Sequence, residues 1–226
     1  MMLKLRVDNR EIETKEGKTL LQACLDNRIY IPNLCYLEDM ERPSASCRMC
    51  FVEIEGMPQP VPSCTVQVKD DMVVKTDTPA VRQLQRTALR FLLSVHDVDC
   101  KNCHANKKCE IQNIARFLKV GLKSKNLTQH FKEPEVIQEH PLLDYYPNRC
   151  VLCGKCYHVC RSQHGRTFLT FAKRGFDTTI SFFGVEDSSL LDCYTCNACV
   201  DICPVGALAP KNNQHRYKEN SHGRQF

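Results

Sequence analysis

The sequence predicts an α+β protein with three successive segments and a polar tail. Residues 1–78 hold short runs in which apolar and polar residues alternate between turns, as is typical of strands. Residues 79–130 open with a helix start signal and a helical apolar repeat. Residues 131–210 contain one cysteine pattern twice. Residues 211–226 are polar and basic, so we expect this tail to be mobile.

The composition is that of a soluble protein from a reducing compartment. The 226 residues are 42% apolar and 25% charged, and sixteen cysteines would suggest disulfides only in a secreted chain. The first ten residues alternate like a strand and lack the apolar core of a leader peptide. The longest apolar stretch, residues 88–95, contains an arginine and is too short to span a bilayer. We therefore expect a cytoplasmic protein without direct membrane insertion, whose thiols are free to bind metal.

The first segment has the pattern of a hairpin, a helix and later strands. Alternation over residues 3–7 and a second run from Ile12 predict the hairpin. Thr19 and Gln22 have the spacing of a capping box, which predicts a helix over residues 20–27. Further strands are expected at residues 51–54, 61–68 and 73–74.

Four cysteines of this segment have the spacing of a metal site. Three lie in the loop after the helix and one on the expected 61–68 strand: Cys35, Cys47, Cys50 and Cys64. Thiolates that converge from a long loop and a distant strand suit a 2Fe–2S cluster, although the first gap departs from plant-type ferredoxin spacing. Tetrahedral zinc uses the same ligands, so the spacing alone leaves both open.

The second segment combines an amphipathic helix with a mixed ligand set. Thr78-Pro79 predicts a helix that runs to His96, with one apolar face made by Val81, Leu84, Ala88, Leu92 and Val95. One imidazole and three thiolates then fall within fourteen residues: His96, Cys100, Cys103 and Cys109. This set suits a 4Fe–4S cluster or a structural zinc ion, and His104 competes with His96 for the histidine position.

The third segment carries the most specific signal in the chain. After a proline-containing linker from about Phe131, two runs of four cysteines duplicate the two-cluster bacterial ferredoxin motif, in which the fourth cysteine of each run binds the other cluster. One 4Fe–4S cluster is therefore assigned to Cys150, Cys153, Cys156 and Cys203. The other is assigned to Cys193, Cys196, Cys199 and Cys160. Two short strands are expected between the runs, at residues 167–172 and 178–183.

Bound clusters would change the charge of the chain. The formal charge of +5 counts every cysteine as a neutral thiol. Three four-thiolate clusters at roughly −2 each and one histidine-containing cluster at roughly −1 would bring the total to about −2. We therefore expect no nucleic-acid partner. A zinc-stabilised nucleic-acid-binding module would instead need zinc and a basic face.

The segments around the first cysteines, residues 32–37 and 47–55, resemble a 2Fe–2S domain of three families. These are the large iron–sulfur subunit of respiratory complex I, iron-only hydrogenases, and the diaphorase small subunit of NAD-reducing hydrogenases. The resemblance implies a β-grasp 2Fe–2S ferredoxin domain, a small helical His/Cys3 4Fe–4S domain, and a bacterial-type two-cluster ferredoxin domain. It favours one 2Fe–2S and three 4Fe–4S clusters over zinc. Lys101-Asn102, where relatives often have a proline, and Arg161, where the second run has Pro204, depart from the pattern.

No motif of catalysis is present in the sequence. It contains no dinucleotide fingerprint, phosphate loop or activated nucleophile, so FMN or FAD and NAD(P) are expected only on partner subunits. The resemblance implies a subunit that relays single electrons between a flavin- and NAD(P)H-binding diaphorase-type subunit and a terminal catalytic redox subunit. Hydrogenase is favoured for the latter, with formate dehydrogenase or another low-potential reductase next. The alternative is a self-contained polyferredoxin; a succinate dehydrogenase iron–sulfur subunit would leave the His96 group unexplained.

Several residues outside the ligand sets have two interpretations. Cys24 lies on the apolar side of the first helix, where a buried structural thiol is expected. His158 and His164 adjoin cluster cysteines and could tune a potential or simply pack. Four basic residues could form a docking face for an acidic partner or be solvated: Lys155, Arg161, Lys173 and Arg174.

Overall fold

The computed structural model describes residues 1–123, 128–183, 193 and 196–211. The predicted mobile tail, beyond Lys211, lies outside the described residues. Across the described part of the chain, no helix has the length and apolar character needed to cross a membrane.

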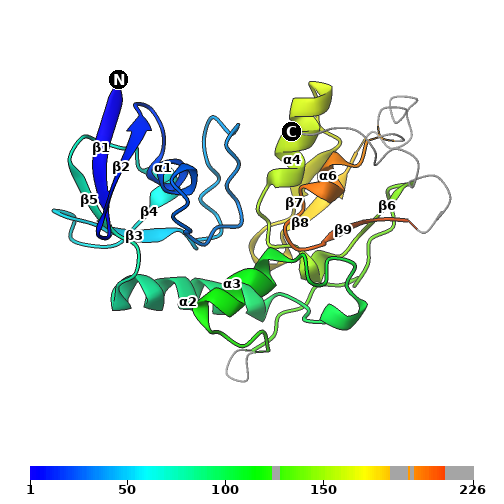
Figure 1. Ribbon diagram of the computed structural model, residues 1–226. Helices are drawn as coiled ribbons and strands as arrows, with labels where there is room; N and C mark the ends of the chain where they lie inside the picture. The colour runs from blue at the N-terminus through cyan, green and yellow to red at the C-terminus, as the bar shows by residue number, and fades with distance from the viewer. Residues whose placement is uncertain (124–127, 184–192, 194–195, 212–226) are drawn as a thin grey trace.

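The first segment folds as a five-stranded mixed sheet with one helix packed on it (Figure 1). The strands lie in the order β2-β1-β5-β3-β4; only β1 and β5 are parallel. The elements are β1 (Met2–Val7), β2 (Arg10–Lys15), α1 (Leu20–Asp26), β3 (Phe51–Ile54), β4 (Val61–Pro62) and β5 (Met72–Lys75). The predicted hairpin, first helix and strands at 51–54 and 73–74 are confirmed, and a helix on a mixed sheet agrees with the β-grasp expectation.

Helix α1 is fixed at its start by Thr19 and along one face by the sheet. The Thr19 hydroxyl accepts a hydrogen bond from the Gln22 N–H at 3.2 Å, which satisfies an N–H group that has no partner within the helix. The reciprocal half of the capping box is replaced, because the Gln22 side chain instead bonds with Asp26 and the Tyr36 hydroxyl. Gln22 therefore ties the helix to the loop that carries the first cysteines.

The predicted strand over residues 61–68 is wrong in its length. Strand β4 ends at Pro62, and Cys64 lies in a short 3₁₀ turn, η1 (Ser63–Thr65). Both the N–H and the hydroxyl of Ser63 donate to the carbonyl of Cys50, at 2.9 and 2.8 Å. These two hydrogen bonds hold the turn against Cys50. Cys64 therefore approaches the cysteine loop from a turn and not from a strand.

The second segment starts with helix α2 (Pro79–Ser94), as predicted, but the helix buries a different face. The Thr78 hydroxyl accepts from the N–H of Val81 at 3.2 Å. The buried positions are Val81, Gln85, Leu89, Leu93 and Ser94, whereas Leu84 of the predicted face is 36% exposed. Gln85 can be buried because its amide donates to the Phe51 carbonyl at 3.2 Å and accepts from Arg82.

The remaining elements are short and build the C-terminal part of the molecule. In chain order they are η2 (Cys100–Asn102), α3 (Glu110–Leu118), β6 (Leu143–Tyr145), η3 (Pro147–Arg149), α4 (Lys155–His164), β7 (Leu169–Ala172), η4 (Gly175–Asp177), β8 (Thr179–Phe182), α6 (Ala198–Asp201) and β9 (Leu208–Pro210). Strands β6 and β9 pair antiparallel, as do β7 and β8. The two strands predicted between the cysteine runs are thereby confirmed.

The sequence predicted a linker from Phe131 to the first cysteine run. This prediction is wrong for the second half of that stretch. Ile137 pairs with Tyr145 in an isolated bridge, and β6 pairs with β9. Tyr145 is 1% exposed, and its hydroxyl accepts a hydrogen bond from the N–H of Ile180 at 3.2 Å. Three prolines in this stretch suggested a linker, but buried aromatic and aliphatic side chains between them join the core.

One of two apolar clusters lies between the sheet and α1, and the other runs from the cysteine loop of the first segment to the last strand. This second cluster includes Leu34 and Met49 of that loop, Leu89 of α2, and Val205 and Leu208 near the C-terminal end. Helices α2 and α3 lie beneath both the sheet and the C-terminal part (Figure 1). Between α3 and the second cysteine run, the N–H of Glu110 donates to the carbonyl of Pro204 at 2.8 Å.

Candidate metal centres

The first cysteine group is buried in a loop with an unusual backbone. Cys35, Cys47, Cys50 and Cys64 are 1, 3, 2 and 1% exposed. The sulfur atoms of Cys35 and Cys47 are 3.4 Å apart, and the N–H of Leu34 donates to the Cys47 sulfur at 3.4 Å. Ala45 and Arg48 have φ values of 49° and 53°, in the left-handed region that side chains rarely adopt. Such strained backbone is a feature of ligand-holding loops.

Hydrogen bonds between sulfur atoms favour thiolate formation in this group. The hydrogen bond with Cys47 is the main reason why the pKa of Cys35 falls to about 5. The hydrogen bond with Cys64 similarly lowers the pKa of Cys50 to about 7. The pKa values of Cys47 and Cys64 are raised, first by the hydrogen bonds that their thiols make with Cys35 and Cys50, then by burial, and then by the nearby thiolate charge. A bound cation would remove this penalty and let all four sulfurs ionise.

The second group lies between the end of α2 and the start of α3. Cys109 is the residue before α3 and is buried, and burial raises its pKa, with Cys103 and Cys100 close enough to add to the effect. His96 is 9% exposed, and its buried Nδ1 atom has no hydrogen-bond partner. Burial lowers the pKa of His96 to about 4, so the imidazole is neutral at physiological pH, the form that binds metal.

His104, the competing histidine, faces a different environment. Burial is the main reason for its lowered pKa, and it has a hydrogen bond with the backbone of Leu208. A Cβ atom placed on Gly206 would lie 3.2 Å from its Cε1 atom. His104 thus packs against the segment after the second cysteine run, whereas His96 keeps an unpartnered nitrogen.

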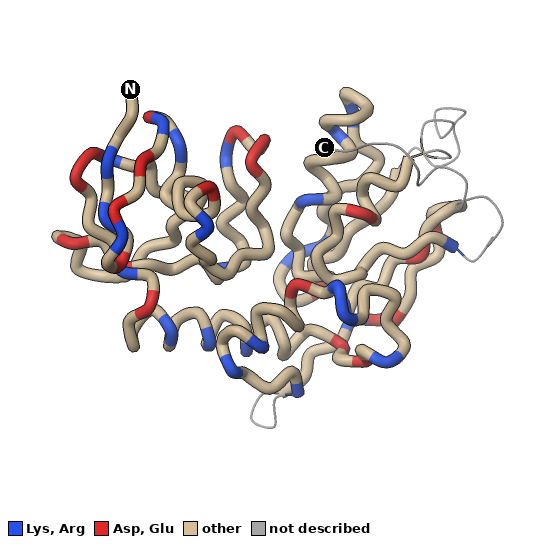
Figure 2. The backbone as a smooth tube through the Cα atoms, in the orientation of Figure 1, with Lys and Arg blue, Asp and Glu red and all other residues tan. Residues whose placement is uncertain are grey.

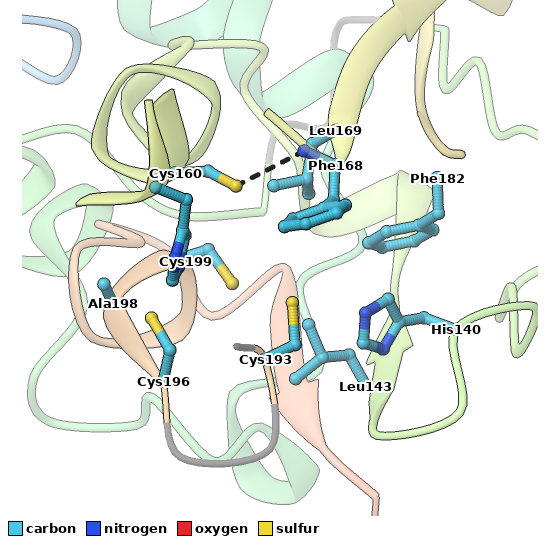
Figure 3. A pocket seen from close by; sticks show the side chains of 11 residues that line it. His140, Leu143, Cys160, Phe168, Leu169, Phe182, Cys193, Cys196, Ala198 and Cys199 are labelled. Atoms are coloured by element: carbon cyan, nitrogen blue, oxygen red, sulfur yellow. Dashed lines mark hydrogen bonds between the residues drawn. The ribbon is translucent and has the colours of Figure 1, made fainter. Parts of the chain in front are cut away.

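The eight cysteines of the two runs line two cavities in a crossed arrangement. One cavity is lined by three cysteines of the first run and one of the second: Cys150, Cys153, Cys156 and Cys203. The other cavity is lined by the complementary set: Cys160, Cys193, Cys196 and Cys199 (Figure 3). Within the described stretches, no three His, Cys, Asp or Glu side chains are arranged to hold a single metal ion.

The cavity walls suit an anionic group of several atoms. Backbone N–H groups donate to cysteine sulfurs at 3.3 to 3.4 Å: Leu152 to Cys150, Phe168 to Cys160, and Ala207 to Cys203. Such donors stabilise negative charge on sulfur. Burial raises the pKa values of Cys153 and Cys199 to about 12, so metal binding must displace their protons. The remaining lining is mainly apolar.

Two cavity-lining residues were missed in the sequence because they lie in the stretch interpreted as a linker. His140 lines the cavity of Cys160, and Tyr145 lines the cavity of Cys150. Of the histidines singled out from the sequence, His164 lines a cavity, while the Nε2 atom of His158 lies 3.0 Å from an Asp39 carboxylate oxygen. The only sequence signal for these two lining residues was their position a few residues before the run that begins at Cys150.

The basic residues considered for docking differ in their exposure. Arg161, Lys173 and Arg174 are exposed, and Lys155 is half-buried. Figure 2 shows basic and acidic residues spread along the chain, from the sheet to α4. Their role in docking stays a prediction.

The domains of the chain are those of iron–sulfur electron-transfer proteins. Residues 1–79 match the model of a 2Fe–2S iron–sulfur cluster binding domain. Residues 85–122 match the NADH-ubiquinone oxidoreductase-G iron–sulfur binding region, and residues 140–209 match the ferredoxin-like domain of NADH-quinone oxidoreductase subunit 3. The chain therefore has a 2Fe–2S domain, an iron–sulfur binding region and a ferredoxin-like domain, as the resemblance of its sequence implied.

Similar proteins match nearly the whole chain with one part of a longer sequence. The chain is 35% identical to the NADH-ubiquinone oxidoreductase 75 kDa subunit of Reclinomonas americana, over 93% of its own length and 30% of the relative. It is 33% identical to the NADP-reducing hydrogenase subunit HndD of Solidesulfovibrio fructosivorans, over 96% of its length and 37% of the relative. The chain thus spans about a third of the length of these two relatives.

A solved structure of a NAD+-reducing [NiFe]-hydrogenase in the H2-reduced state has a chain with the same fold. The TM-score is 0.80 at 26% identity, and the match covers 93% of this chain and 88% of the hydrogenase chain. In its iron–sulfur domains the chain therefore resembles both the large iron–sulfur subunit of complex I and subunits of NAD-reducing hydrogenases.

Proposed function

We propose that the chain is an electron-transfer subunit of a multi-subunit NAD(P)H-linked oxidoreductase. The observation that carries the proposal is the crossed pair of cysteine-lined cavities, combined with a fold similar over 88% of a chain from a NAD+-reducing hydrogenase. Two closely spaced redox sites within one fold suit a relay. In keeping with its iron–sulfur domains, the chain itself would hold no catalytic residues.

The proposed ligand sets are those read from the sequence, within domains at 1–78, 79–130 and 131–210. Cys35, Cys47, Cys50 and Cys64 would hold a 2Fe–2S cluster; His96, Cys100, Cys103 and Cys109 a 4Fe–4S cluster. The cavity sets would hold two more: Cys150, Cys153, Cys156 and Cys203 in one, and Cys160, Cys193, Cys196 and Cys199 in the other. The buried Nδ1 atom of His96, which has no hydrogen-bond partner, supports His96 over His104 as the histidine ligand.

The chain's residues would bind and tune these groups. When bound, iron–sulfur clusters supply one-electron acceptance and donation at sites without proton chemistry of their own. The N–H donors of Leu152, Phe168 and Ala207 would offset negative charge on sulfur. Neutral His96 contributes one negative charge less than a thiolate, which favours reduction at its site.

The proposed partners are those that the sequence resemblance implied, and the similar proteins support partner subunits in general. We propose a flavin- and NAD(P)H-binding diaphorase-type subunit on one side, and a terminal catalytic redox subunit on the other. Hydrogenase is the first choice for the latter, supported by HndD and by the solved NAD+-reducing hydrogenase. Another terminal reductase is the second choice. It is supported by the NADPH-Fe(3+) oxidoreductase subunit alpha of Geobacter sulfurreducens, which is 32% identical to the chain over 24% of its own length. The proposed location is the cytoplasm.

Metal analysis and gentle purification test the proposal together. The anaerobically purified chain should contain about fourteen iron atoms, from one 2Fe–2S and three 4Fe–4S clusters, with matching sulfide. It should co-purify with a flavoprotein when the whole complex is expressed. A chain that holds mainly zinc would contradict electron transfer. A loaded chain that stays a stable monomer with no flavoprotein would indicate a self-contained polyferredoxin.

A further inference from the structure

A histidine from outside both cysteine runs enters one of the crossed cavities. His140 is 2% exposed and lines the cavity of Cys160, Cys193, Cys196 and Cys199. Figure 3 shows its imidazole directed into this cavity between Leu143 and Phe182. The ring centres of His140 and Phe182 are 5.1 Å apart in a tilted contact, which limits rotation of the imidazole.

A backbone hydrogen bond determines which ring nitrogen of His140 can donate. The N–H of Leu142 donates to Nδ1 of His140 at 3.1 Å, so Nδ1 carries no proton. An imidazole with an unprotonated Nδ1 is neutral and holds its proton on Nε2. Burial lowers the pKa of His140 to about 4, which agrees with a neutral ring. Nε2 is therefore the hydrogen-bond donor of this side chain.

The neighbouring cavity receives a comparable donor from the same segment. Tyr145, five residues further on, lines the cavity of Cys150, and its side chain forms a hydrogen bond with the Cys150 sulfur. No histidine is among the described residues that line this second cavity. The segment that contains β6 thus supplies an imidazole to one cavity and a phenol to the other, so the two sites differ in their polar lining.

We propose that Nε2 of His140 donates a hydrogen bond to the cluster held by Cys160, Cys193, Cys196 and Cys199, and thereby raises its reduction potential. The inference rests on the proposed function, because it requires that cluster. Reduction adds negative charge that is shared with sulfur, so a donor stabilises the reduced form more than the oxidised form. His140 is a tuning residue in this proposal and makes no bond to iron.

The test compares the full-length wild-type chain with His140→Leu and His140→Gln, each loaded with iron and sulfide. Leucine removes the donor, whereas glutamine keeps an N–H donor. Potentiometric titration followed by EPR should show one reduction step at lower potential in His140→Leu. The same step should lie closer to its wild-type position in His140→Gln, and the other steps should not move. His130→Leu is the control, because His130 is exposed and stacks on Phe176, 4.9 Å away.

Three results would overturn the inference. Unchanged potentials in His140→Leu would show that no such hydrogen bond exists. An equal shift in both variants would assign the effect to packing, and loss of about four iron atoms from both would identify His140 as a ligand. A wild-type chain that binds no iron–sulfur clusters would contradict the proposed function instead, and would be recognised before any variant is compared.

Discussion

At the scale of single residues, the two histidines of the second group differ in what they can bind. Each histidine has one backbone hydrogen bond, His96 with Arg149 and His104 with Leu208, but His96 also has a buried Nδ1 atom without a partner. We expect His96→Ala to lose about four iron atoms and His104→Ala to retain them. His96→Cys should retain iron but lower the potential of that cluster, because a thiolate adds negative charge. Iron analysis and redox titration check both, and equal iron loss in the two alanine variants would contradict the assignment.

Cys24 makes the stability of the first segment depend on pH. It is fully buried in α1, and burial, followed by the nearby Asp8 charge, raises its pKa from 9.0 to about 12. Because the folded-state pKa of this thiol is raised, its contribution to the free energy of unfolding is complete below the unfolded-state pKa. The contribution is lost as pH rises through the folded-state pKa. We expect the free energy of unfolding to fall between about pH 9 and about pH 12, by at most ~1.4 kcal/mol per pH unit from this one proton.

A Cys24→Ala variant isolates this effect. Its absolute stability should be lower because the thiol fills space in the core, but its pH dependence over that range should be flatter than that of the wild type. Denaturant midpoints measured at several pH values give both curves. Parallel curves for the two proteins would show that the thiol does not titrate upon unfolding.

Single polar residues also mark where the sequence could not reveal the structure. The polar side chain of Gln85 argued against burial of its face of α2. That face is nevertheless buried, because the Gln85 amide donates to the distant Phe51 carbonyl. The apolar pattern was therefore assigned to a face that includes the exposed Leu84. Local spacing cannot report a partner 34 residues away in the chain. By contrast, Thr19 and Thr78 cap helices through neighbours, and both caps were predictable.

At the scale of elements, α4 contributes to both crossed cavities. Cys156 and Cys160 lie one turn apart in this helix, and they line different cavities. Cys199 lies in α6 and Cys203 follows that helix, and these two also line different cavities. Helix α4 therefore supplies one ligand candidate to each cavity, and so does the segment made of α6 and the residues that follow it.

Double variants measure this crossing directly. Cys150→Ser combined with Cys203→Ser should remove one cluster and about four iron atoms, since both residues line one cavity. Cys150→Ser combined with Cys160→Ser should remove two clusters and about eight iron atoms, although both residues belong to one run. Iron content separates the two outcomes. The reverse result would mean that each run binds its own cluster.

The repeat of cysteine runs was readable from sequence because the ligand spacing is local within each run. Cys64 was also found, but the prediction placed it on a strand, because its 3₁₀ turn depends on the Cys50 carbonyl. His140 and Tyr145 escaped because prolines around them suggested a linker, and the strand partner of β6 lies more than sixty residues later. The turn at Cys64 and the burial of His140 and Tyr145 both depend on contacts between segments far apart in the sequence, which local spacing does not reveal.

At the scale of the whole molecule, Gly206 sets how closely the second and third segments pack. Its φ is 67°, and a Cβ atom there would lie 2.6 Å from the Cβ atom of Ala105. Gly165 has nearly the same φ, 68°, but a Cβ atom there would meet nothing within 4 Å. The two glycines therefore share the backbone requirement and differ in the contact.

Alanine substitutions separate these two effects. Gly165→Ala should cost about 1–2 kcal/mol, for the left-handed backbone alone. Gly206→Ala should cost a further ~1–3 kcal/mol, because Ala105 or the backbone must move. Apparent melting temperatures of the loaded proteins by circular dichroism should show the larger decrease for Gly206→Ala. Equal decreases would mean that the Ala105 contact adapts without penalty.

The hydrogen bond from Glu110 to Pro204 joins two metal groups through the backbone. Glu110 follows Cys109, and Pro204 follows Cys203, so the donor and the acceptor are each one residue from a proposed ligand. Ordering either loop around its metal restricts the other loop through this 2.8 Å contact. We therefore expect the two proposed sites to be linked in their loading, because occupancy of one would lower the conformational entropy that the other must lose. Metal uptake by the two sites should then be cooperative.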